Sequence, residues 1–247
     1  MKTCVVTGVL NPGIGRAVLE RLRKDGWKVI GTYGADQREE NEKHSFSNTS
    51  LYEVDYLSRG SIESFLSSIG TERIDAFINV HMYFNMENPD NFDHNEFEKS
   101  IFINLTIPNF LLHALKERFS SNAAAVVVTS TEGFIGSFGA SAYAASKAAI
   151  HNLVKTHANN LGAKGVRVNA VAPGWIGGVM DTDDVFNMSR KITPLGRLGT
   201  PEEVAGVIAF LLSGDAGFVN GTVITVDGGY TGVDTIAKFE FEASRKS

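Results

Sequence analysis

Short runs of β-branched and apolar residues alternate along this chain with stretches whose apolar residues recur every three or four positions. The runs are TCVVTG (3–8), WKVIGTY (27–33), IDAFINV (74–80), AAAVVVTS (123–130), VRVNAVAPG (166–174) and TVITVDGG (222–229). The first stretch between them carries Ile14, Val18 and Leu22 at helical spacing. Strands that are apolar throughout and separated by helices indicate a parallel sheet covered on both faces. The alternation therefore predicts one α/β domain with three layers.

The composition narrows the classes of function. The 247 residues suffice for one domain with a substantial core, and a net charge of -5 gives no general reason to bind nucleic acid or an anionic membrane. The single cysteine, Cys4, excludes an internal disulfide and is expected to be a small buried hydrophobe. No apolar stretch approaches the ~20 residues that span a bilayer, and the chain enters a strand-like run at once, which leaves no room for a signal peptide. We therefore expect a cytoplasmic protein without nucleic-acid or membrane partners.

A glycine-rich segment, TGVLNPGIG (7–15), joins the first apolar run to the first helical stretch. The N–H groups at a helix start can hold a phosphate, and Gly13 and Gly15 would let the backbone approach it closely. The spacing is unusual, because four residues separate Gly8 from Gly13, and Pro12 has no N–H to donate. We expect the turn to bulge. On its own, the segment is equally consistent with a dinucleotide loop and with a structural turn.

Four polar residues elsewhere form a candidate catalytic set. Tyr143 and Lys147 are four apart on a predicted helix and so share one face. Ser130 ends the run 123–130, and Asn104 lies inside another predicted helix. Taken singly, Ser130 could cap a strand end, Asn104 could satisfy helix backbone, and the other two could be an ordinary aromatic and a solvated charge.

In this order along the chain, and together with the segments 166–176, 194–213 and 221–230, these motifs resemble the short-chain dehydrogenase/reductase (SDR) family. The resemblance runs from Thr3 to about Tyr230. It implies a Rossmann-type fold with a seven-stranded parallel sheet in a single domain (1–230). Residues 231–247 would be a C-terminal extension available for a subunit contact in a homotetramer or homodimer.

The resemblance also implies an oxidoreductase that interconverts a carbonyl and a secondary alcohol. Tyr143 would be the general acid/base, with Lys147 and a positively charged oxidised nicotinamide together lowering its pKa. Lys147 would also hold the nicotinamide ribose. Lowering that pKa from ~10 to about 7 would require ~4 kcal/mol of differential stabilisation. Ser130 would hydrogen-bond the substrate oxygen, and Asn104 would hold a water that connects Lys147 to solvent.

Further family positions are expected to contact a nicotinamide dinucleotide, and no metal is expected. These positions are Gly8, Asn11, Gly13, Ile14, Gly15, Tyr33, Asp55, Asn79, Tyr143, Lys147, Pro173, Gly174 and Ile176. Tyr33 stands where NAD-preferring relatives carry an acidic residue, which favours NADP(H). Arg16 and Arg38 are candidate ligands for its 2′-phosphate, whereas Asp36 argues for NAD(H). Asp55 would contact the adenine amino group, or else form a strand-end turn.

The sequence departs from the family after the third run, where Asn-Asn-Ala-Gly is replaced by Asn79-Val80-His81-Met82. The bulky His81 and Met82 are expected to narrow the cofactor passage. His81 is also a candidate acid–base group, although packing is the commoner role of such a histidine. Gly178 stands where the family often has a threonine that bonds the carboxamide, and it could belong to a flexible substrate lid.

The residues expected around the substrate are mostly apolar or aromatic. They are Tyr83, Phe84, Met86, Phe134, Phe138, Trp175, Val179 and Met180. We therefore expect an apolar or aromatic small-molecule substrate. Three alternatives stay open: an NAD(H)-dependent dehydrogenase, non-redox chemistry such as dehydration on the same scaffold, and a non-catalytic nucleotide-binding protein.

Overall fold

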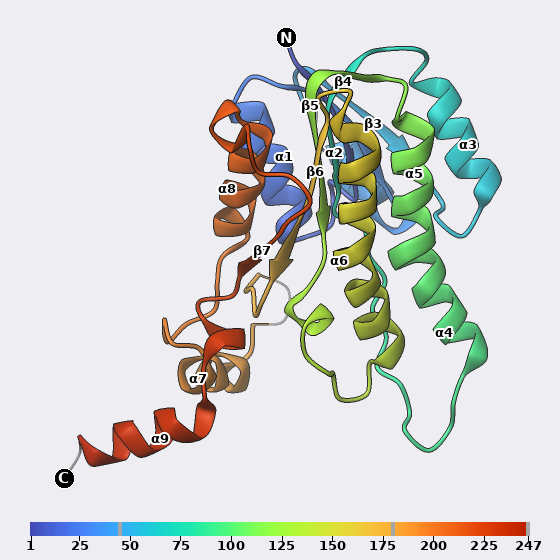
Figure 1. Cartoon of the computed structure of the whole chain (residues 1–247). Coiled ribbons are helices and arrows are strands. Elements are labelled where there is room, and N and C mark those ends of the chain that lie inside the picture. The colour runs from blue at the N-terminus through green and yellow to red at the C-terminus, as the bar shows by residue number, and fades with distance from the viewer. Residues whose placement is uncertain (44–45, 179–180, 246–247) are drawn as a thin grey trace.

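Seven parallel strands form one sheet in the order β3-β2-β1-β4-β5-β6-β7 (Figure 1) in the computed structural model, which describes residues 1–43, 46–178 and 181–245. The strands are β1 Thr3–Thr7, β2 Lys28–Tyr33, β3 Thr49–Glu53, β4 Ile74–Asn79, β5 Phe119–Val128, β6 Arg167–Pro173 and β7 Val223–Val226. Each of the six predicted runs overlaps one strand. The seventh strand, β3, lies at one edge of the sheet, and its sequence, TSLYE, has only two adjacent apolar residues, so it lacks the apolar run by which the others are recognised.

Helices cover both faces of the sheet. In the described part of the chain they are α1 Ile14–Lys24, α2 Arg38–Lys43, α3 Arg59–Ser68, α4 His94–Ile101, α5 Ile107–Leu115, α6 Ser141–Gly162, α7 Asp183–Ile192, α8 Pro201–Leu212 and α9 Thr235–Ser244. Helices α3, α5 and α6 pack on one face, and α1 and α8 on the other (Figure 1). The predicted three-layer Rossmann-type fold is confirmed.

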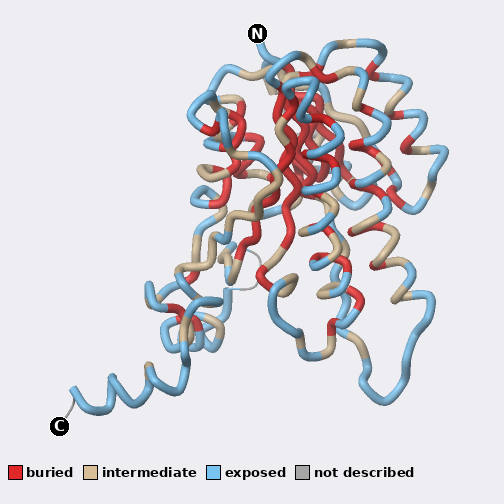
Figure 2. Tube along the Cα trace, viewed as in Figure 1, coloured by how far each residue is buried: buried red, intermediate tan, exposed pale blue. Residues whose placement is uncertain are grey.

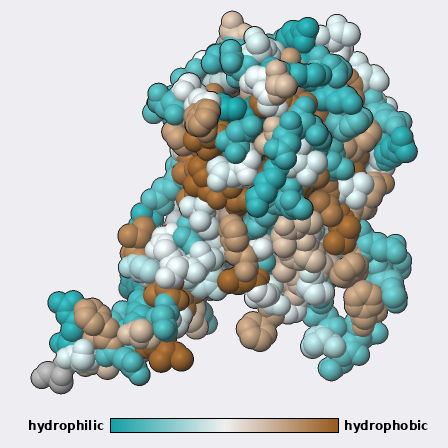
Figure 3. Space-filling model, viewed as in Figure 1, coloured by the Kyte–Doolittle hydropathy of each residue, from teal (hydrophilic) through white to brown (hydrophobic). Residues whose placement is uncertain are grey.

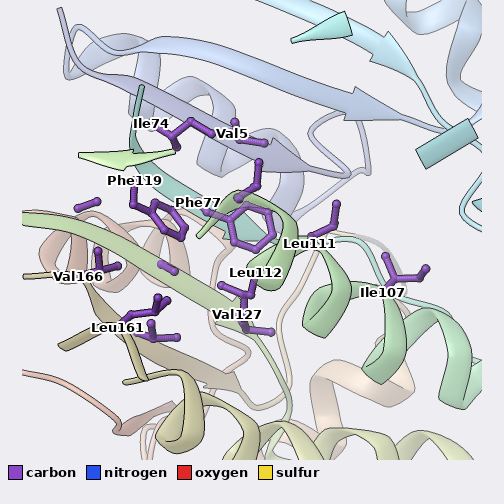
Figure 4. Close-up of a cluster of buried hydrophobic side chains, with 14 of the residues drawn as sticks. Val5, Ile74, Phe77, Ile107, Leu111, Leu112, Phe119, Val127, Leu161 and Val166 are labelled. Carbon is purple, nitrogen blue, oxygen red and sulfur yellow. The ribbon is translucent and has the colours of Figure 1, made fainter. Parts of the chain in front are cut away.

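The core consists of two apolar clusters, one on each face of the sheet (Figure 2). Strand β1 supplies both, because Val5 points to one cluster while Cys4 and Val6 point to the other. Figure 4 shows the first cluster, in which Phe77 of β4 packs among side chains from α5 and β5. Cys4 is fully buried, as predicted.

The strand order reverses between β1 and β4, which are neighbours in the sheet although β2 and β3 intervene in sequence. In open parallel sheets, ligands bind outside the carboxyl ends of the strands at such a point. The segments that follow β1, β4, β5 and β6 therefore define where a site can form.

The C-terminal helix α9 projects from the body of the protein (Figures 1 and 2) and has no buried residue. Its side chains Ile236, Phe239 and Phe241 are exposed, and Figure 3 shows hydrophobic surface on this projecting segment. Within the described ranges, no helix combines the length and the apolar character needed to cross a membrane.

Candidate active site

Helix α6 and the end of β5 bring Tyr143, Lys147 and Ser130 together. The Lys147 side chain is buried, and its Nζ lies 5.4 Å from the centre of the Tyr143 ring. The same Nζ donates a hydrogen bond of 3.1 Å to the carbonyl oxygen of Val128, the last residue of β5. The Ser130 hydroxyl, directly after this strand, is near enough to the Tyr143 phenol to lower its pKa. Three of the four predicted catalytic residues thus converge.

These three side chains line a cleft of about 310 Å³ at the carboxyl edge of the sheet, a volume typical of small-molecule sites. The predicted cofactor positions that line it are Asn11, Gly13, Ile14, Gly15, Tyr143, Lys147, Pro173, Gly174 and Ile176. Met82, Trp175, Asp181, Val185 and Leu198 contribute further wall. Four other predicted positions, Gly8, Tyr33, Asp55 and Asn79, lie outside this lining.

The lengthened glycine loop accommodates its extra residue by burying Val9 and Leu10 in the protein. The Val9 N–H donates to the Thr32 carbonyl oxygen at 3.0 Å, so the loop stays attached to β2. Gly8 and Gly13 adopt positive φ angles of 70° and 83°, which glycine tolerates without strain. The bulge expected from the spacing is therefore taken up by the core, and Asn11 to Gly15 face the cleft.

The start of α1 fits the phosphates of a dinucleotide. Gly13 is its N-cap and supplies no side-chain hydrogen bond, and the first N–H groups of a helix lack partners within the helix. A Cβ added to Gly15 would lie 2.1 Å from the carbonyl oxygen of Gly8, so only glycine permits this close crossing of the backbone. Gly178 has a φ of 101°, and a Cβ added to it would lie 3.9 Å from the Cα of Gly13. The segment after β6 thus flanks the phosphate loop.

The segment after β4 is held by hydrogen bonds to β1. The Thr7 hydroxyl donates to Asn79 Oδ1 at 3.2 Å and accepts the backbone N–H of His81 at 3.2 Å. The His81 ring stacks on Tyr56, with 3.9 Å between ring centres. Burial, and next the charge of Lys147, lower the pKa of His81 to about 4, so the ring is neutral at neutral pH. Packing is therefore the role that the geometry gives His81, while Met82 lines the cleft as expected.

Asn104 lies in a π-helical turn, Phe102–Thr106, between α4 and α5, where a regular helix was predicted. Its amide is bonded to the backbone of Tyr83, accepting from the N–H at 2.8 Å and donating to the carbonyl at 2.7 Å. It also donates to the Ser100 hydroxyl at 3.2 Å. Asn104 thus fastens the segment after β4, and its predicted water-holding role stays a prediction.

The chain's own groups raise the pKa of Tyr143 to about 12, whereas the lowered pKa expected from the sequence included the charge of an oxidised nicotinamide. Burial is the largest cause; the Ser130 hydrogen bond lowers the pKa, and the nearby Glu132 carboxylate raises it. Burial also lowers the pKa of Lys147 to about 8. The chain's own groups therefore hold Tyr143 protonated at neutral pH and leave Lys147 largely charged.

The residues expected at the adenosine end have other partners in the structure. Arg38 forms a bidentate ion pair with Glu53, with N–O distances of 2.7 and 2.6 Å. Arg16 lies 3.4 Å from Glu20 and faces the Phe46 ring. The Asp36 carboxylate lies against Gly34: a Cβ added to Gly34 would be 2.4 Å from Asp36 Oδ1.

Two predicted cofactor residues at this end are also bonded within the chain. The Tyr33 hydroxyl accepts a hydrogen bond from Asn41 at 3.1 Å, and Tyr33 is buried. Asp55 accepts the N–H of Leu57 at 2.9 Å, which is the strand-end turn considered as its alternative role. Their contacts with a cofactor stay predictions.

Three of the predicted substrate-side residues surround Tyr143. The Phe84 ring meets the Tyr143 ring edge-on at 5.1 Å, Trp175 shares the cleft, and Met86 lines an adjoining cavity that Tyr143 also borders. The others lie elsewhere: Tyr83 bonds Glu96, Phe134 packs on His151, and Phe138 is almost fully exposed. The remaining two, Val179 and Met180, lie outside the described residues.

Sequence reasoning missed two polar residues that support α6. Thr129 donates to the carbonyl oxygen of Lys147 at 3.0 Å and so ties the end of β5 to the helix. Glu87 accepts hydrogen bonds from the first turn of α6. The position of Thr129 directly before Ser130 was a usable signal, whereas the contact of Glu87 spans more than fifty residues and has no local signature.

Several known proteins resemble this chain over most of its length, and another over about half of it. A family model described as enoyl-(acyl carrier protein) reductase matches residues 8–231. The 3-oxoacyl-[acyl-carrier-protein] reductase FabG of Thermotoga maritima is 31% identical over 92% of this chain and 97% of its own length. Cyclohexanol dehydrogenase of Acinetobacter sp. is 30% identical over 93% and 95%. Cis-4-hydroxycyclohexanecarboxylate dehydrogenase of Sinomonas cyclohexanicum is 43% identical, over only 49% of this chain and 50% of that protein.

Solved structures share the fold. A short chain dehydrogenase family protein from Francisella tularensis superposes with a TM-score of 0.85 at 26% identity, covering 94% of this chain and 100% of that one. BdcA in complex with NADPH gives 0.84 at 24% identity, covering 92% and 93%. The 4-hydroxyisoleucine dehydrogenase complexed with NADH gives 0.87 at 22%, covering 95% and 100%. Sequence, fold and the convergence of Ser130, Tyr143 and Lys147 lead to one conclusion: the chain belongs to the short-chain dehydrogenase/reductase family of oxidoreductases.

Proposed function

We propose that this protein interconverts a carbonyl and a secondary alcohol with NADP(H), using Tyr143 as the general acid/base. The observation that carries the proposal is the convergence of Tyr143, Lys147 and Ser130 on one cleft that the glycine loop also lines. A nicotinamide cofactor bound there would supply or accept the hydride. The residues of the chain would bind and orient the reactants and manage the proton.

In the reductive direction the substrate carbonyl must gain a proton as its oxygen becomes negative. Tyr143, whose raised pKa of about 12 keeps it protonated, is the donor. Ser130 lies beside the phenol and can hydrogen-bond the same oxygen, which stabilises the developing charge. The buried Lys147 ammonium stabilises the phenolate that remains after the proton has left.

The walls around Tyr143 favour an apolar or aromatic substrate. Phe84 packs against the Tyr143 ring, and Trp175 and Met82 line the cleft. Two of the relatives carry names of dehydrogenases that act on cyclic alcohols. Cyclohexanol is therefore a suitable first probe.

The preference for NADP(H) rests on Tyr33, the last residue of β2, which places no carboxylate where it would repel a 2′-phosphate. NAD(H) is the second candidate, because the Asp36 carboxylate lies against Gly34, directly after this strand. The pairing of Arg38 with Glu53 also favours NAD(H), since a 2′-phosphate would have to compete with Glu53.

We further propose that the protein is a cytoplasmic homotetramer or homodimer in which residues 231–247 contact a neighbouring subunit. The exposed apolar side chains of α9, Ile236, Phe239 and Phe241, support this role, because nothing in the described chain covers them. Light scattering on the full chain and on a variant ending at Gly232 would test it. An unchanged mass in the shortened variant would exclude α9 from the contact.

The first experiment is to titrate the purified protein with NADPH and with NADH, following fluorescence and thermal melting. Stabilisation mainly by NADPH supports the proposal, and a response to neither cofactor refutes it. Cyclohexanol oxidation is then compared in wild type and in Tyr143→Phe. Loss of the phenol should lower kcat by roughly 10²- to 10⁴-fold with cofactor affinity unchanged, and retained turnover would remove Tyr143 from the mechanism.

A further inference from the structure

The catalytic helix α6 has no capping hydrogen bond from its own N-cap side chain. Its N-cap residue, Ala140, has no side-chain acceptor, and Gly139 before it adopts a φ of 63°. The first N–H groups of a helix need partners from elsewhere, and Ser, Thr, Asn or Asp at the N-cap usually supply them. Tyr143 is the third residue of this first turn. Any fraying of the turn would therefore move the phenol.

Glu87, more than fifty residues earlier in the chain, supplies the missing cap. Its Oε1 accepts the backbone N–H of Ala142 at 2.7 Å, and its Oε2 accepts the Ser141 hydroxyl at 2.6 Å. Its own N–H donates to the Gly139 carbonyl oxygen at 2.7 Å. Three hydrogen bonds thus join Glu87 to the three residues that flank or begin the helix.

The segment 83–87, which we call the strap, is fixed at both ends. At one end the Asn104 amide bonds both backbone groups of Tyr83, and at the other Glu87 holds α6. Between them Phe84 meets the Tyr143 ring edge-on, at an angle of 86°. The strap therefore contacts α6 in two ways. Glu87 is hydrogen-bonded to the first residues of the helix, and Phe84 packs against the Tyr143 ring.

Charge favours this arrangement. A carboxylate at the positive end of a helix is stabilised by the helix dipole. Burial raises the pKa of Glu87, but the hydrogen bonds from Ser141 and Ala142 outweigh it, so the pKa lies below its ordinary value. Glu87 is thus ionised at neutral pH.

We propose that Glu87 is a positioning residue, whose carboxylate caps α6 from outside the helix and sets the position of Tyr143. The proposal rests on the proposed role of Tyr143 as acid/base. The remainder of α6 is anchored independently, because Ile150 and Val154 are fully buried in the core. Loss of the cap would therefore loosen the first turn and leave Lys147, one turn further on, in place.

The test compares Glu87→Ala, which removes both acceptor oxygens, with Glu87→Gln, which keeps one. Ser58→Ala is the matched control, because Ser58 caps α3 by accepting the Ser61 N–H at 3.2 Å and lies in no part of the site. In Glu87→Ala we expect kcat for cyclohexanol to fall about tenfold, equivalent to about 1.4 kcal/mol and within the range of a lost N-cap. KM and the cofactor Kd should stay within about twofold of wild type. Glu87→Gln should recover about a third of the lost rate, and Ser58→Ala should keep wild-type kcat.

Amide hydrogen exchange provides a second readout that needs no substrate. In both Glu87 variants the amides of Ala142, bonded to Glu87, and Ala144, bonded to the Ala140 carbonyl oxygen, should exchange faster than in wild type, while that of Ile150 should not change. Unchanged exchange in the first turn, or a kcat loss no greater than in Ser58→Ala, would overturn the proposal. If Glu87→Ala does not fold, the near-isosteric Glu87→Gln decides through the same two readouts. If Tyr143→Phe retains turnover, the proposed function fails by itself, and the exchange data still decide whether Glu87 caps the helix.

Discussion

The two halves of the cleft use their polar side chains differently. In the half built by β5 and α6, Ser130, Tyr143 and Lys147 are gathered around one another, and all three line the cleft. In the half built by β1 and β4, Thr7 and Asn79 are bonded to each other and to the neighbouring backbone. There the cleft is lined by the glycine loop, residues 11–15, and by Val80 and Met82. Substitutions should therefore affect chemistry in the first half and folding in the second.

Lys147→Met should have the largest effect: it should lower kcat and raise the stability of the folded state at pH 7. Loss of the ammonium should lower kcat by roughly 10³-fold. Burial holds the Lys147 pKa at about 8, below the ordinary 10.5, so below pH 8 the folded state carries the cost of a buried charge. The variant should therefore be more stable than wild type at pH 7 by about 1 to 3 kcal/mol, and the difference should vanish as pH rises from 8 to 10.5.

Urea titrations across this pH range measure that difference. Lys155→Met, which replaces an exposed lysine of the same helix, is the control and should change neither kcat nor the pH dependence. A Lys147→Met protein less stable than wild type at pH 7 would mean that the hydrogen bond to Val128 outweighs the burial of the charge.

Gly15→Ala tests the glycine half of the cleft. The added methyl would lie 2.1 Å from the Gly8 carbonyl oxygen, so the loop and the start of α1 must separate. We expect a loss of about 2 to 3 kcal/mol of stability and at least tenfold weaker cofactor binding. Calorimetric melting and fluorescence titration measure the two effects. At Gly214, where nothing lies within 4 Å of an added Cβ, the same substitution should be nearly silent, and equal effects at both positions would contradict the argument.

His81→Phe should change stability only on the acid side. The folded-state pKa of about 4 lies below the ordinary 6.5, so wild type loses stability as pH falls from 6.5 towards 4, because only the unfolded chain takes up the proton. Phenylalanine keeps an aromatic ring against Tyr56 and removes this loss, which we expect to be about 2 kcal/mol. Parallel unfolding curves at pH 7 and pH 5 measure it. Identical acid sensitivity in the two proteins would show that His81 is protonated in the folded state.

Asp36→Ala should have the smallest effect, and it tests the choice between NADP(H) and NAD(H) as the cofactor. Asp36 is exposed, so its charge acts through solvent and is screened by salt. Its removal should tighten NADPH binding about threefold at low ionic strength and leave NADH binding weaker or unchanged. Equal changes for both cofactors would place Asp36 away from the adenosine ribose.

Local patterns gave the correct architecture and pointed to side chains that the structure brings together at one cleft. Six of the seven strands were visible as apolar runs, and the four-residue spacing of Tyr143 and Lys147 placed both on one face of α6. Strand β3 lacked such a run because its sequence, TSLYE, has only two adjacent apolar residues, Leu51 and Tyr52. The π-helical turn at Asn104 was missed, because its sequence has ordinary helical spacing.

The direction of the Tyr143 pKa shift could not be predicted either. The sequence shows that Lys147 is near, and a nearby ammonium in general lowers the pKa of a phenol, but burial raises it and is the largest cause of the shift here. Burial depends on how α6, β5 and the strap pack together. Charges can be counted along a chain, whereas their desolvation cannot.

By itself, the amino-acid sequence determined the alternation of strands and helices, the parallel sheet and the identity of the residues that meet at its carboxyl edge. These features follow from periodicity and from spacings of a few residues, which the backbone geometry converts directly into faces and layers. Only the tertiary structure decided that Glu87 caps α6, that His81 stacks on Tyr56 and that Tyr143 stays protonated. Each of these depends on groups far apart in the chain, whose contacts and loss of water arise only when the whole core has packed.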